Sequence, residues 1–128
     1  NNFLAQNIDE TAPGSKIIKL TAPEGLIPVD FTNWANIKAP TGYYDQNTNI
    51  LSLTDNVEIF YSEGMTLQTQ EAAFDFNQSK GYGTTRVHAD GYFGSLVADG
   101  FEFSGKDDIL IFTGHNDITI KEESLKGR

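Results

Sequence analysis

Four side chains in the second half of the chain belong to types that bind metal ions. They are His88, Asp90, His115 and Asp117. Zinc sites in proteins usually draw two ligands from one segment, a few residues apart, and complete the tetrahedron from a second. The two histidines instead lie in separate segments, each with only an aspartate nearby. We therefore expect surface histidines, no metal site and no cofactor.

Paired carboxylates suggest a second kind of chemistry, glycoside hydrolysis, which needs two acidic side chains across one bond. Asp99 with Glu102, or Glu58 with Asp75, could form such a pair. The chain has eighteen acidic residues, so pairs arise easily by chance. Glu58, Asp75 and Glu102 also fall on the polar side of alternating segments, where solvated charges are expected. We expect no catalytic residues and no enzyme.

Composition excludes further classes of function. The 128 residues carry a formal charge of −9, which repels phosphates, so we expect no nucleic-acid partner. The chain has no cysteine and therefore no disulfide or thiolate chemistry. No run of apolar residues is long enough to span a membrane. Twelve glycines and many Phe and Tyr residues favour an all-β domain.

Short segments of alternating apolar and polar residues, separated by Gly, Asn and Asp, run along most of the chain. Segments repeat: Thr66–Phe76 resembles Ser95–Phe103, and Leu51–Ile59 resembles Leu110–Ile118. The repeats predict tandem hairpins of long antiparallel strands. We expect a poorly structured segment at 1–15, one β-domain over 16–121 and a polar tail at 122–128.

The long segments have a polar or glycine-containing midpoint, and the clearest is Asp99-Gly100 within Ser95–Phe103. Leu96 and Ala98 share one face of a strand, whereas Phe101 and Phe103 have the opposite parity. If all four face one core, the strand is irregular between them, as at a β-bulge or corner. The same change of parity occurs between Leu67 and Phe74. These bends predict a folded antiparallel sheet, or a jelly-roll-like V.

Side-chain parity then assigns an apolar inner face to the folded sheet. It comprises Leu51, Leu53, Val57, Ile59, Leu67, Phe74, Phe76, Val87, Leu96, Ala98, Phe101, Phe103, Leu110, Phe112, Ile118 and Ile120. Two residues break the pattern, because Ile109 and Ile111 are apolar on the outer face. A last strand that is apolar on both faces is expected to be covered or to meet a partner by strand addition.

Two stretches resemble one known family. They are "GYYDQNTNILSLTDNVEIFYSEGMTLQTQEAAFDF" (Gly42–Phe76) and "FGSLVADGFEFSGKDDILIFTGHNDITI" (Phe93–Ile120). Their order and spacing are similar to those of the periplasmic domain of LptC, the inner-membrane component of the lipopolysaccharide export bridge in Gram-negative bacteria. The resemblance covers roughly Ala39–Ile120.

The resemblance implies a bent antiparallel β-jelly roll with open edges, OstA/LptA-like, whose interior takes the lipid A acyl chains of lipopolysaccharide. The residues expected to line this groove are Leu53, Val57, Ile59, Leu67, Phe74, Phe76, Val87, Leu96, Phe101, Phe103, Phe112 and Ile118. An LptA-like protein would add strands at the C-terminal edge, at Ile109, Ile111, Ile118 and Ile120.

By the same resemblance, transporter subunits of the LptB-F-G type would meet the N-terminal edge. The domain would lie in the periplasm, held to the inner membrane by an N-terminal helix that this chain lacks. Two alternatives stay open at this point. One is a soluble LptA-like bridge protein, and the other is a carbohydrate-binding jelly roll.

Overall fold

The computed structural model describes residues 2–28, 34–62, 64–107 and 109–120, and in these ranges it contains strands and turns only. Fourteen strands, all paired antiparallel, form one open sheet. The prediction of an all-β bent sheet with open edges is confirmed. Within the described ranges no helix could span a membrane.

The sheet folds into two walls that share β13 (Gly94–Ser104) and β14 (Ile109–Ile120). The first wall continues in the order β12 (Val87–Gly91), β9 (Thr66–Thr69), β8 (Val57–Tyr61), β5 (Trp34–Lys38), β4 (Glu24–Pro28) and β1 (Asn2–Leu4). The second continues in the order β11 (Lys80–Gly83), β10 (Ala72–Asp75), β7 (Ile50–Thr54), β6 (Thr41–Asp45), β3 (Ile17–Thr21) and β2 (Asn7–Glu10).

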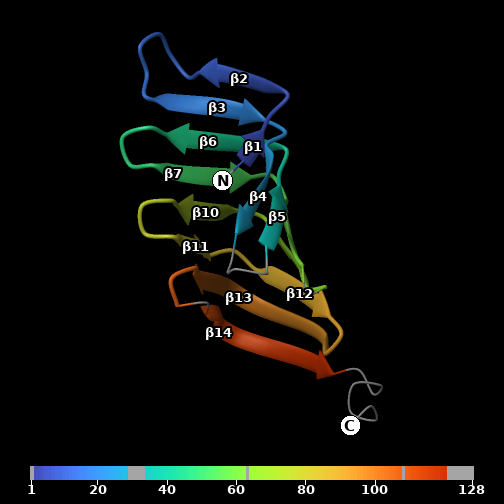
Figure 1. Cartoon of the computed structure of the whole chain (residues 1–128). Helices are drawn as coiled ribbons and strands as arrows, with labels where there is room; N and C mark the ends of the chain where they lie inside the picture. Colours follow the sequence, from blue (N-terminus) through green and yellow to red (C-terminus); the bar gives the residue numbers. More distant parts are fainter. Residues whose placement is uncertain (1, 29–33, 63, 108, 121–128) are drawn as a thin grey trace.

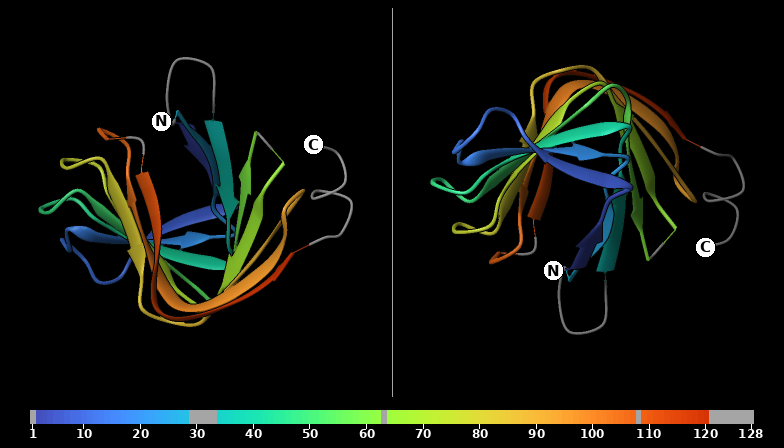
Figure 2. Two further views of the ribbon diagram at one scale, coloured as in Figure 1. Left: turned by 90° about the horizontal axis from the view of Figure 1, so that it is seen from below. Right: turned by 90° about the horizontal axis from the view of Figure 1, so that it is seen from above.

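The chain crosses from one wall to the other at the predicted midpoints. For example, β7 and β8 are separated only by Asp55 and Asn56, and β9 and β10 only by Gln70 and Glu71. Asp55 and Asn56 both have positive φ, at 69° and 86°. Asn and Asp tolerate this left-handed region better than other non-glycine residues. The hairpins stack in a column in Figure 1, and seen end-on in Figure 2 the two walls form an open V.

β13 passes through the bend without a break, and its partner β14 curves with it (Figure 2). The predicted change of parity is confirmed, because Leu96, Ala98 and Phe101 are all buried in the core. The register with β14 shifts at this point: Ala98 pairs with Asn116 whereas Gly100 pairs with Thr113. The extra residue of the bulge lies in β14, not in β13: Gly114 and His115 together oppose Asp99. Gly114 has φ +74°, which a bulge of this type reserves for glycine.

Gly100 is required at the bend for another reason, which is space. A Cβ atom built there would lie 2.4 Å from the carbonyl oxygen of Gly83 and 2.8 Å from Oγ1 of Thr113. Contacts this short to backbone cannot be relieved by turning a side chain. The Asp99-Gly100 pair is therefore a bend within one strand rather than a hairpin turn.

The N-terminal segment differs from the expectation of poor structure at 1–15. β1 pairs with β4 and β2 pairs with β3, so this segment adds one short strand to each wall. The large apolar residues there, Phe3, Leu4 and Ile8, are too few and too irregular in spacing to show a strand pattern by themselves. Pairing with a neighbouring strand supplies the order that local sequence does not. The polar tail expected at 122–128 lies outside the described residues.

The core lies between the two walls at the middle of the V. Its most buried large side chains include Ile37, Leu51, Leu53, Val57, Leu67, Val87 and Phe101. The facing walls bring together residues from strands far apart in sequence, as in a two-sheet sandwich. Toward the two ends of the sheet the inner face becomes progressively exposed, because no further strand covers it.

Candidate functional site

The predicted inner-face residues divide into two groups. Leu53, Val57, Ile59, Leu67, Phe74, Val87, Leu96 and Phe101 are buried and pack against one another. Phe76, Phe103 and Phe112 are only partly buried at the margin of this core, and Ile118 is 58% exposed at the end of the sheet. The second group, together with Phe74 of the first, presents apolar surface to space outside the core.

An apolar pocket of about 470 Å³ opens beside this margin, at the N-terminal end of the V. Its walls are formed by Phe3, Leu4, Ala5, Ile8, Ile18, Leu20, Tyr44, Asn49, Leu51 and Phe76. The volume lies in the range typical of small-molecule sites, and the lining is almost wholly hydrocarbon and aromatic. This space suits an apolar ligand. We call it the N-terminal pocket.

A smaller pocket of about 90 Å³ follows toward the C-terminal end of the V. We call it the central pocket. Its apolar lining consists of Ile27, Phe74, Phe76 and Phe103, and the rest of its lining consists of Asp75, Ser79, Lys80 and Gly105. Phe76 is the lining residue that the two pockets share. We call the line from one pocket to the other past Phe76 the inner path.

Two aromatic pairs join the walls along this path. The rings of Phe3 and Phe76 meet edge to face with centroids 6.0 Å apart, and those of Tyr61 and Phe103 meet similarly at 6.4 Å. In each pair one residue belongs to the first wall and the other to the second. Edge-to-face pairs of this kind are weakly stabilising, by about 0.5–1.5 kcal/mol beyond burial.

A larger hollow, of about 850 Å³, is a less suitable site for an apolar ligand. It is a broad depression beside β1 with polar residues in its lining, among them Gln6, Glu24 and Asn36. The Asn36 side chain donates a hydrogen bond to Glu24 across 3.3 Å. This hollow shares Phe3, Leu4 and Ala5 with the N-terminal pocket, but the polar part of its lining makes it the poorer site for hydrocarbon.

Most of the N-terminal pocket comes from residues that the sequence analysis did not select. Phe3, Ile8, Ile18 and Leu20 all precede the part of the chain where the repeat is clear. The alternation of Ile18 and Leu20 on β3 is the signal that could have found them, because both face inward through pairing with Tyr44 and Gly42. Of the predicted lining residues, Phe76 borders this pocket, and Phe74, Phe76 and Phe103 border the central one.

β14 forms one end of both walls and pairs only with β13 among the residues that the structure describes. Ile109, Ile111, Ile118 and Ile120 are all about half exposed on it. Ile118 pairs with Leu96 and faces inward, whereas Ile111 pairs with Glu102 and faces outward. Ile109 and Ile111 also border a hollow of about 250 Å³ on the outer face, beside Tyr82. The edge is thus long, apolar on both faces and open to a further strand.

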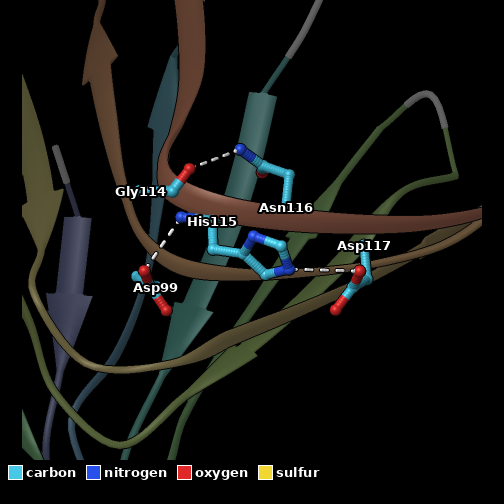
Figure 3. A network of polar contacts seen from close by, with 5 residues as sticks. All are labelled: Asp99, Gly114, His115, Asn116 and Asp117. Atoms are coloured by element: carbon cyan, nitrogen blue, oxygen red, sulfur yellow. Dashed lines mark hydrogen bonds and ion pairs between the residues drawn. The ribbon is translucent and has the colours of Figure 1, made fainter.

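The bulge in β14 is held by a small polar network (Figure 3). The backbone N–H of His115 donates to Oδ2 of Asp99 across 2.9 Å, and the Asn116 amide donates to the carbonyl of Gly114 at 2.9 Å. The imidazole of His115 lies 3.3 Å from Asp117, with both side chains largely exposed. Asp99 therefore satisfies a donor that the bulge removes from the strand ladder.

The residues considered for metal binding and hydrolysis have other placements. His88 lies on β12, separated by β13 from Asp117 on β14. No group of three or more His, Asp or Glu side chains within the described ranges is arranged to hold a metal ion.

The candidate carboxylates have structural partners or face solvent. Glu58 lies 3.5 Å from Nζ of Lys38, and Asp75 accepts hydrogen bonds from the two backbone amides of its own hairpin turn, those of Asn77 and Gln78. Glu102 is exposed on the outer face. These acids do not converge on a common cleft.

The comparison with protein families gives a match over residues 1–119, to the family described as "LptC: Lipopolysaccharide-assembly, LptC-related". The chain belongs to the LptC family. This confirms the resemblance and extends it to the N-terminal strands, well before Ala39. No curated protein matches the chain.

Membership in the LptC family implies a role in lipopolysaccharide transport, in association with other Lpt proteins. It also implies the periplasm of a Gram-negative bacterium as the setting. The family is a transport component rather than a known family of enzymes. The apolar pockets and the open sheet edges of this LptC-family chain are therefore candidate sites for lipid and protein partners.

Proposed function

We propose that this domain holds lipid A acyl chains between its two walls and passes lipopolysaccharide onward across its C-terminal edge. The observation that carries the proposal is the apolar lining of the N-terminal pocket, which Phe76 shares with the central pocket, where Phe74 and Phe103 continue the apolar path. Each methylene that leaves water for such a surface gains about 0.8 kcal/mol, so hydrocarbon binds there without any specific polar contact. The buried predicted residues, such as Leu53 and Val57, would support this path from behind.

The edges of the sheet support the second part of the proposal. β14 offers twelve residues of strand to a soluble LptA-like protein, which would continue the V by adding its own strands. Ile118 and Ile120 would then be covered on the inside and Ile109 and Ile111 on the outside. At the other end, β1 and β2 would face transporter subunits of the LptB-F-G type at the inner membrane.

Lipid contact is tested by photo-crosslinking from inside the V. A benzophenone amino acid at Phe76, which borders both pockets, should form an adduct with lipopolysaccharide on irradiation. The same group at Tyr43 is the matched control, because Tyr43 pairs with Ser52 on the outer face and is 36% exposed. Equal adducts at both positions, or none at Phe76, would contradict the proposal.

Binding of a partner at the β14 edge is tested by placing a charge on the inner face of β14. Ile118→Asp should weaken binding of an LptA-like partner at least tenfold, because an added strand would bury the carboxylate. The thermal midpoint of the free domain should hardly change, since Ile118 is already 58% exposed. Tyr92→Asp, at a 74% exposed position in the turn before β13, is the control. Unaltered partner affinity in Ile118→Asp would place the contact elsewhere.

A further inference from the structure

We propose that Phe3 is the movable wall of the N-terminal pocket, and that its contact with Phe76 gates the passage of an acyl chain between the two pockets. The inference rests on the proposed lipid-binding function and names the device that controls access to that site. It adds a specific role for the short strand β1.

Phe3 is placed to hold the Phe76 ring in position between the two pockets. It pairs with Gly25 on β4, so its side chain points inward. Its ring meets the ring of Phe76 from the opposite wall, with centroids 6.0 Å apart. Because Phe76 borders both pockets, a chain that extends from the N-terminal pocket into the central one must displace this ring. Phe3 is the side chain that rests against it.

The strand that carries Phe3 is weakly attached. β1 has three residues, and its sheet partner is β4 alone. The next residue in the same strand, Leu4, is 78% exposed. Short edge strands with few buried contacts open at low cost compared with strands inside a sheet. Phe3 can therefore leave the pocket while the remainder of both walls stays in place.

The second aromatic pair, Tyr61 with Phe103, is held on both sides by strands inside the sheet. Tyr61 lies on β8, which is paired on both sides by β5 and β9. Its partner Phe103 lies on β13, between β11 and β14. Neither residue can move far without breaking an internal strand. Of the two cross-wall pairs, only Phe3–Phe76 has a member on an edge strand of three residues.

The gate is tested by the rate at which cis-parinaric acid, a fluorescent fatty acid, enters the intact chain in stopped-flow mixing. Phe3→Ala should raise the association rate several-fold, because the Phe76 ring is no longer supported from the opposite wall. Phe60→Ala is the matched control, since Phe60 is 43% exposed on the outer face and borders neither pocket. Melting curves verify that both variants are folded.

The converse experiment closes the gate covalently. Leu4 and Glu24 are direct partners across β1 and β4, and the chain has no other cysteine to interfere. Directly opposed strand residues lie within the Cα distance that a disulfide spans. The double variant Leu4→Cys/Glu24→Cys should admit the probe several-fold more slowly when oxidised, and reduction should restore the rate.

The possible results separate the gate from the site. If the probe binds and lipopolysaccharide competes for it, but neither Phe3→Ala nor the oxidised lock changes the rate, the gate is wrong and lipid binding stands. If the wild-type chain does not bind the probe, or lipopolysaccharide does not compete, the proposed lipid site fails and the gate with it. Faster entry in Phe3→Ala together with slower entry in the oxidised lock supports both.

Discussion

The two ends of the folded sheet are built differently. At the C-terminal end, β13 and β14 have 11 and 12 residues and run without interruption through both walls. At the N-terminal end, β1 and β2 have three and four residues and are separated at Ala5-Gln6. The first end fixes one wall to the other through continuous strand ladders. The second end places one short strand on each wall.

This difference indicates which end of the V is strongly restrained by strand ladders and which end is weakly restrained. A continuous strand transmits the bend through its own backbone, and its ladder with a neighbour must break before the walls separate. Two short strands joined by a few residues impose no such restraint. The N-terminal pocket lies at the weakly restrained end. In the proposed function, access for a ligand and stability of the fold therefore fall at opposite ends of the sheet.

The largest expected effect comes from crowding the rigid end. Gly100→Val should lower the free energy of unfolding by about 3 kcal/mol, because its Cβ would collide with the Gly83 carbonyl. Urea denaturation measures this directly. Gly14→Ala is the control: Gly14 has φ +78° but nothing within 4 Å of its Cβ position, so only backbone strain of about 1 kcal/mol remains. An equal loss of unfolding free energy in both variants would show that close packing at the bend is not the cause.

A smaller effect is expected from the bulge that accompanies this bend. Asp99→Ala removes the acceptor of the His115 backbone N–H and should cost about 1–2 kcal/mol. Asp117→Ala serves as the control, because its contact with His115 joins two largely exposed side chains. Denaturant midpoints of the two variants should separate clearly. A cost for Asp117→Ala as large as that for Asp99→Ala would show that charge, rather than the bulge, matters.

The smallest effect is expected at the N-terminal end. Ile8→Ser should change the free energy of unfolding by less than about 0.5 kcal/mol, since Ile8 is 66% exposed. Amide hydrogen exchange should show the same contrast, with β1 and β2 exchanging much faster than β13. Protection of β1 equal to that of β13 would mean that the two ends are equally rigid.

Alternation and the polar midpoints predicted much of this architecture. The crossings at Asp55-Asn56 and Asp99-Gly100 follow from local residue types, because few residues accept these backbone conformations or close approaches. The inward parity of Leu96, Phe101 and Ile118 also follows from period-two spacing. The tandem hairpins were also predicted from the repeats, whereas the order in which the hairpins join into one sheet was not.

The sequence by itself therefore determined an all-β chain of bent strands with one apolar side, since these depend on local backbone preference and parity. Only the tertiary structure decided which apolar residues are sealed in the core and which border a pocket, because that depends on the facing wall. It also made strands of residues 2–4 and 7–10, whose order comes from their partners β4 and β3. The contact of Phe3 with Phe76 also depends on the tertiary structure, because the two residues lie far apart in sequence and on different walls.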